Sequence, residues 1–184
     1  MNNNKDAGGK TMGVTWEEIN QWKVEQFIDT FGTIYEHSPW VAELVWEKKP
    51  FSSWEQLHTA TSSIVASADE ERQLKLLRNH PDLGARLELT DHSQHEQQRA
   101  GIAAMHEAGL EELRQLNREY TGKFGFPFIM AVRHSTADLI LNELKRRIQL
   151  DREQEFKAAL QEVYKIAGFR LQDWNAEQLL TEQG

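Results

Sequence analysis

Apolar residues recur at helical spacing along most of the chain, and residues that can cap a helix precede many of these stretches. Thr15 and Glu18 form a capping-box pattern, which predicts a first helix that continues to about Phe31. Further caps are expected at Ser38, Ser53, Asp69, Ser93 and Ser135. They predict helices over about residues 38–49, 53–67, 70–79, 93–108, 110–120, 135–150 and 152–169.

Glycine and proline positions are expected to separate these helices. Gly109 is predicted to break one helix, and Gly122 together with the segment Phe124–Phe128 is predicted to end the next. Signals for β-hairpins, such as Asn-Gly turns between alternating β-branched residues, are missing from the chain. The sequence therefore predicts an all-α fold, a single-domain helical bundle of seven to nine helices over residues 14–184, after a flexible polar tail over residues 1–13.

Composition excludes several classes of protein. The chain has 184 residues, a net charge of -8 and no cysteine, so nucleic acid is an unfavourable partner and disulfide or thiolate sites are ruled out. No apolar stretch reaches the roughly 20 residues that a membrane-spanning helix requires. The first residues also lack the apolar core of a secretion signal. We therefore expect a cytoplasmic protein that binds neither nucleic acid nor membrane.

The dipeptide His80–Pro81 places a titratable ring at a forced helix end. Proline lacks an N–H and restricts the backbone of the residue before it, so His80 cannot lie inside a helix. Histidine exchanges a proton most readily near neutral pH, which makes His80 a candidate for proton transfer. The competing interpretation is a histidine that merely closes a helix by interacting with its carbonyl end.

A polar run with a second candidate group follows at Ser93–Gln97. Ser93 and Glu96 have the spacing of a capping box, so Glu96 could simply bond the backbone N–H of the cap. A helix N-terminus also presents free N–H groups that can hold ligand oxygens, so the two roles are compatible.

Five motifs in register resemble one known family. In chain order they are His80-Pro81-Asp82-Leu83-Gly84, Ser93-x-x-Glu96-Gln97-x-x-Ala100-Gly101, Leu116-Asn117-x-x-Tyr120, Lys123-Phe124-Gly125-Phe126-Pro127-Phe128-Ile129 and Lys165-Ile166-Ala167-x-x-Arg170-Leu171. The chain is similar over about residues 15–175 to the decarboxylases of 2-oxo-4-hydroxy-4-carboxy-5-ureidoimidazoline (OHCU), which form (S)-allantoin in urate catabolism. The resemblance implies an all-helical enzyme, a carboxy-lyase that is commonly a homodimer and in some bacteria is fused to a urate oxidase.

The resemblance also implies a role for particular residues. His80 would transfer protons, Glu96 would orient the substrate hydroxyl toward His80, and Arg170 would clamp a planar, electron-rich group of the substrate. The other expected substrate contacts are Pro81, Ser93, Gln94, His95, Gln97, Phe128, Ile129, Met130, Ala131 and Val132. Because residues 128–132 are apolar, their contacts with the substrate are expected to come from the backbone.

Neither a cofactor nor a metal is expected. In OHCU the carboxylate is on a carbon adjacent to an imine, so the substrate itself can accept the electrons that decarboxylation releases. His92, His95 and Glu96 could suggest a metal site, but the expected third ligand and the surrounding signature are absent.

Two other functions remain open at this point. The chain could be a non-catalytic helical interaction module in which His80 and Arg170 are structural, or a hydrolase that acts on a related ureide.

Overall fold

The computed structural model describes residues 14–81, 83, 107–133 and 135–180. These residues form eight α-helices and no β-strand, which confirms the predicted all-α class. In chain order the helices are α1 (Trp16–Gln21), α2 (Val24–Phe31), α3 (Trp40–Trp46), α4 (Trp54–Ser67), α5 (Glu70–Arg78), α7 (Glu107–Phe124), α8 (Ala137–Arg147) and α9 (Arg152–Leu180). The predicted tail over residues 1–13 and the helix predicted after Ser93 lie outside the described residues.

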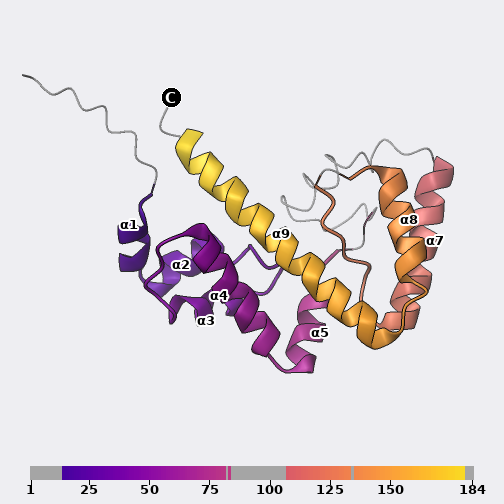
Figure 1. Cartoon of the computed structure of the whole chain (residues 1–184), viewed down its shortest axis with the longest axis horizontal. Helices are drawn as coiled ribbons and strands as arrows, with labels where there is room; N and C mark the ends of the chain where they lie inside the picture. Colours follow the sequence, from indigo (N-terminus) through magenta and orange to yellow (C-terminus); the bar gives the residue numbers. More distant parts are fainter. Residues whose placement is uncertain (1–13, 82, 84–106, 134, 181–184) are drawn as a thin grey trace, which may run out of the picture.

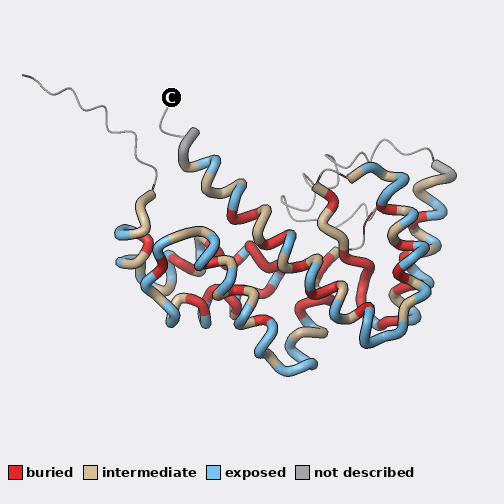
Figure 2. The backbone as a smooth tube through the Cα atoms, in the orientation of Figure 1, coloured by how far each residue is buried: buried red, intermediate tan, exposed pale blue. Residues whose placement is uncertain are grey.

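Helix α9 joins two groups of helices (Figure 1). The first group comprises α1 to α4, the second comprises α7 and α8, and α5 lies between them. Helix α9 contacts α4, α5 and α7. Figure 2 shows that buried residues lie along the middle of α9 and on the faces of the helices that surround it. No helix among the described residues combines the length and the apolar character that crossing a bilayer would require.

Three helix starts follow the predicted capping chemistry. The hydroxyl of Thr15 accepts from the backbone N–H of Glu18 at 3.2 Å, and the Glu18 carboxylate accepts from the N–H of Thr15 at 2.8 Å. Ser53 caps α4 through the N–H of Gln56 at 3.1 Å. Asp69 caps α5 in the same way through Arg72. These capping hydrogen bonds join residues only three positions apart, so the sequence pattern alone predicts the three helix starts.

The predicted first helix is wrong at its centre, where the chain breaks between α1 and α2. Trp22 has an extended backbone, with φ -60° and ψ 142°, and Lys23 continues it. The Trp22 carbonyl accepts hydrogen bonds from Trp46 Nε1 at 3.0 Å and from Lys49 Nζ at 2.7 Å. Side chains from a later part of the chain therefore take the place of the helical hydrogen bond.

The expected break at Gly109 is also wrong, because α7 runs through both Gly109 and Gly122. A glycine inside a helix costs only about 1 kcal/mol relative to alanine. The buried side chains of Leu113, Tyr120 and Phe124 hold α7 against the core. Packing therefore outweighs the weak helix propensity of the two glycines.

Three other helices have ends that differ from the predicted ones. Pro39 rather than Ser38 is the cap of α3, which ends at Trp46, and Thr136 rather than Ser135 caps α8. Helix α9 continues to Leu180, well beyond the predicted end at residue 169. The ring of Trp174 in this extension lies 5.2 Å from that of Phe31 and 5.3 Å from that of Trp54, between ring centroids. Contacts with the first group of helices thus support the last turns of α9.

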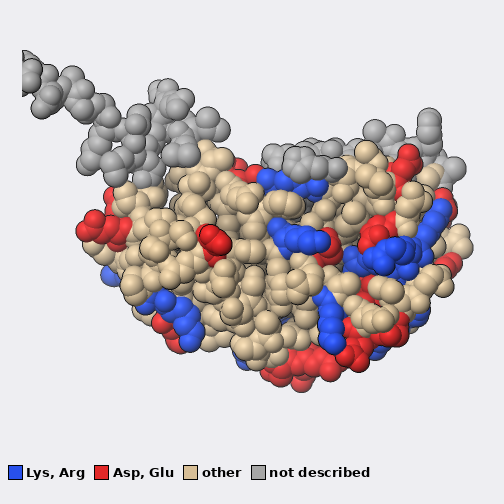
Figure 3. Space-filling model, viewed as in Figure 1, with Lys and Arg blue, Asp and Glu red and all other residues tan. Residues whose placement is uncertain are grey.

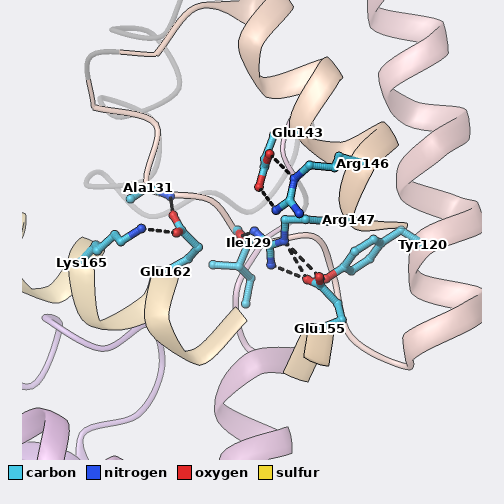
Figure 4. A network of polar contacts seen from close by, with 9 residues as sticks. All are labelled: Tyr120, Ile129, Ala131, Glu143, Arg146, Arg147, Glu155, Glu162 and Lys165. Atoms are coloured by element: carbon cyan, nitrogen blue, oxygen red, sulfur yellow. Dashed lines mark hydrogen bonds and ion pairs between the residues drawn. The ribbon is translucent and has the colours of Figure 1, made fainter. Parts of the chain in front are cut away.

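A buried ionic network holds the second group of helices to α9 (Figure 4). The side chains of Arg147 in α8 and Glu155 in α9 are 2% and 0% exposed. Arg147 Nε lies 2.9 Å from Oε1 and 3.1 Å from Oε2 of Glu155, and the Tyr120 hydroxyl of α7 donates to the same carboxylate. Burial, together with the hydrogen bond and the negative charge of Glu155, raises the pKa of Tyr120, so this phenol stays protonated.

We expect Arg147→Met to destabilise the protein by about 3–5 kcal/mol, because the substitution leaves the Glu155 carboxylate buried without its cation. The matched control is Arg146→Met, which removes the neighbouring but solvent-exposed ion pair with Glu143. That control should cost at most about 1 kcal/mol. Urea unfolding followed by circular dichroism measures both values. Equal losses in the two variants would show that the buried pair contributes no more than the exposed one.

Candidate active site

His80 lies directly after α5, where its own backbone and Pro81 end the helix. Its N–H donates to Leu77 O at 3.2 Å, and its side chain is buried, with the residue 7% exposed. The ring atom Nδ1 lies 3.1 Å from the carbonyl oxygen of Leu76. A carbonyl only accepts hydrogen bonds, so Nδ1 carries the proton and Nε2 of the neutral ring carries the free lone pair. The helix-closing contact foreseen as the competing interpretation therefore also fixes which nitrogen can act as a base.

The surroundings of His80 keep its ring uncharged at neutral pH. Burial lowers the pKa of His80 to about 4, against a usual value of 6.5, and the positive charge of Arg170 contributes in the same direction. The hydrogen bond with Leu76 and the negative charge of Glu36 oppose this shift. The fold thus brings the two predicted residues together, close enough for the positive charge of Arg170 to act on the ring of His80.

Arg170 is buried in α9 and forms an ion pair that the sequence did not indicate. Arg170 Nη1 lies 2.8 Å from Glu36 Oε2, and both side chains are 1% exposed. The same nitrogen donates to Ile34 O at 3.2 Å. Glu36 lies between α2 and α3, in a stretch where a glutamate before His37 and Ser38 has the pattern of an ordinary polar turn. No sequence signal could have distinguished it, because its burial depends on α9.

Two hydrogen bonds link the end of α5 and the segment that follows it to the later motifs. Arg78 Nε donates to Gly125 O at 2.8 Å, and Gly125 has a φ of 80°, which glycine adopts without strain. Asn117 Nδ2 in α7 donates to Leu83 O at 2.8 Å. The His-Pro motif, the Leu-Asn motif and the Phe-Gly-Phe-Pro turn therefore form one contiguous structure.

The predicted backbone-contact segment, residues 128–132, is extended and largely buried (Figure 4). Arg147 Nη1 donates to Ile129 O at 2.7 Å, and Ala131 N donates to Glu162 Oε2 at 2.8 Å. These two groups are engaged within the protein itself. Among the described residues no hydrogen bond involves the backbone of Met130, which lies between them, or that of Phe128.

Lysines of the family-like motifs have structural partners. Lys123 Nζ donates to Ile148 O at 2.6 Å and to Leu150 O at 2.9 Å, at the end of α8. Lys165 Nζ lies 2.5 Å from Glu162 Oε1, the carboxylate whose other oxygen holds Ala131. Both lysines therefore support the frame of the site.

Ser93, Gln94, His95, Glu96 and Gln97 lie outside the described residues, so the structure places neither the expected capping box nor the second acidic group. The rejected metal alternative, which uses His92, His95 and Glu96, lies there too. Within the ranges that the structure does describe, no cluster of three or more histidine, aspartate or glutamate side chains is arranged to hold a metal ion.

A surface hollow of about 770 Å³ lies elsewhere, along α4. Its lining includes Phe51, Gln56, Thr59, Ser63 and Ser67, and none of the predicted site residues contributes to it. It contains no titratable group comparable to His80, so we place the candidate site at His80 and Arg170 and not in the hollow.

The fold and the site define a class of protein: an all-helical domain with a buried neutral histidine beside a buried arginine. The family profile described as OHCU decarboxylase matches residues 20–172, and the chain belongs to this family. A 2-oxo-4-hydroxy-4-carboxy-5-ureidoimidazoline decarboxylase of Halalkalicoccus jeotgali is 46% identical over 160 residues, which cover 87% of this chain and 91% of the relative.

A larger relative and two solved structures extend the comparison. The uric acid degradation bifunctional protein PucL of Bacillus subtilis is 42% identical over 92% of this chain, which spans only 33% of that protein. The crystal structure of (S)-allantoin synthase superimposes with a TM-score of 0.71 at 35% identity, covering 88% of this chain and 54% of that one. A crystal structure of OHCU decarboxylase in the presence of (S)-allantoin has the same fold, with a TM-score of 0.63 at 22% identity over 82% of this chain and 96% of that one.

The depressed pKa of His80 predicts a pH-dependent stability. The unfolded chain, with a usual histidine pKa of 6.5, binds more protons than the folded protein does between pH 6.5 and about 4. The stability that depends on a neutral His80 is therefore fully present above pH 6.5, and the free energy of unfolding decreases as the pH falls through this window. We expect the free energy of unfolding to drop by about 2–3 kcal/mol more in the wild type than in His80→Gln between pH 7.5 and pH 4.5. Parallel urea titrations measure this difference, and identical pH profiles would contradict a buried neutral His80.

Proposed function

We propose that this protein is a carboxy-lyase that decarboxylates OHCU to (S)-allantoin in urate degradation. The observation that carries the proposal is the buried pair of His80, with Nε2 available as a base, and Arg170, in a chain that belongs to the OHCU decarboxylase family. Relatives that are named for this activity cover most of the chain.

The chemistry requires one bond to break and two protons to move. The bond between C4 and the carboxylate breaks, its electron pair forms a C4–C5 double bond, and the imine nitrogen takes up a proton while CO2 leaves. The resulting enaminol then loses its hydroxyl proton, regains a C4 carbonyl and accepts a proton on one face of C5. The substrate provides the electron sink, so the protein has to supply only orientation and proton transfer.

His80 suits the proton transfers of this sequence. Its ring is neutral at pH 7 and its Nε2 has a free lone pair, so it can accept the hydroxyl proton and return a proton to carbon. A substrate carboxylate beside it would offset the charge of Arg170 and raise the pKa of His80 toward the working pH. Binding of the substrate would thereby make His80 a more effective base.

Arg170 and the extended segment would orient the substrate. Arg170 brings a buried positive charge next to His80, and a planar guanidinium suits a carboxylate or urea group. The backbone of Met130 would meet the amide groups of the ring. By family resemblance, Glu96 would bond the substrate hydroxyl, Ser93 to Gln97 would line the substrate, and Pro81 would shape the wall next to His80.

We further infer a homodimer of a single helical domain over residues 14–184 that works in the cytoplasm without a metal or cofactor. Fusion to a urate oxidase, or cooperation with one, is supported by the bifunctional Bacillus subtilis relative, of which this chain matches one third. On the face that Figure 3 shows, acidic and basic side chains of the described residues alternate over the second group of helices. This arrangement gives no continuous basic surface for nucleic acid there.

A stereochemical assay tests the activity directly. Freshly generated OHCU incubated with the protein should lose its absorbance faster than the spontaneous reaction and yield CO2 together with enantiomerically enriched (S)-allantoin. A helical interaction module would leave the spontaneous, racemic outcome unchanged. A hydrolase acting on a ureide would consume its substrate without releasing CO2 from this carbon.

We expect His80→Ala to lower kcat by roughly 10²–10⁴-fold, the range for loss of a general acid or base. The matched control is His58→Gln, which removes another imidazole that bonds a backbone carbonyl, Tyr164 O at 2.7 Å. The control should keep its rate within a few-fold. Stopped-flow absorbance gives both rates, and circular dichroism confirms that both variants are folded. A folded His80→Ala protein with the rate of the wild type would exclude His80 from proton transfer.

A further inference from the structure

Arg133, directly after the predicted backbone-contact segment, is bound to the turn of α9 that carries Arg170. Its Nη2 donates to Phe169 O at 3.3 Å and forms an ion pair with the Asp173 carboxylate. The central carbon of its guanidinium lies 4.4 Å from the centroid of the Phe169 ring. Phe169 immediately precedes Arg170, and Asp173 follows it by three residues. One side chain thus links the end of the segment to residues on either side of Arg170.

A second link joins the middle of the same segment to α9, about two turns earlier. Ala131 N donates to Glu162 Oε2 at 2.8 Å, and Lys165 Nζ lies 2.5 Å from the other oxygen of this carboxylate (Figure 4). Glu162 is eight residues before Arg170, so the helical rise places their backbones about 12 Å apart along α9. The segment therefore follows α9 in the direction of Arg170, and the two links set its position relative to that residue.

The ion pair of Arg133 does not by itself indicate a function, because its side chains are 19% and 33% exposed and such pairs also occur where only the fold uses them. The distinguishing feature is the segment that it holds. Residues 128–132 form neither helix nor strand, and among the described residues the backbones of Phe128 and Met130 make no hydrogen bond. Such a backbone keeps a constant position only through side-chain packing and through links of this kind.

Formation of one allantoin enantiomer requires that the substrate ring present one face to the proton donor. After loss of CO2, C5 of the enaminol is planar, and a proton added to either face gives one of the two enantiomers. A ring held at one end only, by the guanidinium of Arg170, could turn over about that contact. A second contact at a fixed distance, from the backbone of residues 128–132, would exclude the reversed orientation.

We propose that Arg133 is a positioning residue that determines the stereochemical outcome of the reaction, because it fixes residues 128–132 relative to Arg170. This inference rests on the proposed function and on the substrate contacts expected in this segment. Arg133 itself binds α9 and need not touch the substrate. Its removal would loosen the second contact with the ring, whereas His80 and Arg170 would keep their own partners.

Arg133→Met tests the proposal, because it keeps a long side chain and removes the guanidinium. We expect the enantiomeric excess of (S)-allantoin to fall toward that of the racemic mixture, since the ring is then protonated on both faces. We also expect kcat/KM to fall roughly 10–10²-fold, because the ring is less well oriented. Chiral chromatography of the product and stopped-flow absorbance measure these two effects, at enzyme concentrations high enough that spontaneous, racemic decay of OHCU contributes little product.

The matched control is Arg146→Met, which breaks a solvent-exposed ion pair with Glu143 by the same substitution. It should leave the enantiomeric excess and the rate as in the wild type. A folded Arg133→Met protein with the enantiomeric excess of the wild type would overturn the proposal, whatever its rate. If Arg133→Met does not fold, Arg133→Lys decides the matter. Lysine keeps the charge but lacks the planar group over Phe169, so we expect an intermediate enantiomeric excess, and a wild-type value would contradict the proposal.

Amide hydrogen exchange tests the positioning without substrate. In the ¹⁵N-labelled full-length protein, the N–H of Ala131 should exchange faster in Arg133→Met than in the wild type or in Arg146→Met, because the segment has lost one of its links to α9. Equal exchange rates in the three proteins would contradict positioning by Arg133. Racemic allantoin, or none, from the wild type would instead refute the proposed function and with it the stereochemical role, while the exchange rates would still show whether Arg133 positions the segment.

Discussion

The charges that helix α9 carries into the interior must be neutralised there, and this constraint determines how the protein is assembled. Glu155, near the start of α9, pairs with Arg147 of α8, and Arg170, further along, pairs with Glu36 between α2 and α3. Each pair is almost completely buried. Separating either pair would therefore cost free energy, because the two charges would remain in the interior without each other. One helix is thereby tied by ion pairs to both groups of helices, and the candidate site lies where the second tie meets the end of α5.

The same ties support the site. Arg147 neutralises Glu155 and also holds the carbonyl of Ile129, while Glu162 holds the N–H of Ala131. An extended segment without secondary structure thus has a defined backbone conformation, which is what binding through backbone groups requires. At the other end of the site, the bond from His80 to Leu76 both completes the turn after α5 and selects the tautomer with a basic Nε2. Groups that stabilise the fold are therefore also the groups that the proposed chemistry would use.

Three helix starts were predictable from a cap and a partner that lie three residues apart. Thr15, Ser53 and Asp69 fall in this class, since nothing beyond the local chain is needed to satisfy the first N–H groups of the helix. The errors have the opposite origin. Trp22 leaves the helix because Trp46 and Lys49 bond its carbonyl, Gly109 stays helical because α7 is packed, and α9 lengthens because Trp174 meets Phe31 and Trp54. These three errors lie where partners distant in sequence outweigh a preference of about 1 kcal/mol, whereas the caps of α3 and α8 differ from the predicted ones by a single residue.

The sequence by itself determined the all-α class, the end of a helix at His80–Pro81 and the motifs that indicate an OHCU decarboxylase, because these depend on local stereochemistry and on residue types in order. Only the tertiary structure decided that His80 is buried and neutral, that Arg170 is desolvated and that Glu36 is its partner. The physical reason is that desolvation belongs to no single residue. A glutamate in a polar turn and an arginine in a helix have ordinary surface character in the sequence, and they become a buried pair only when α9 packs over the segment between α2 and α3.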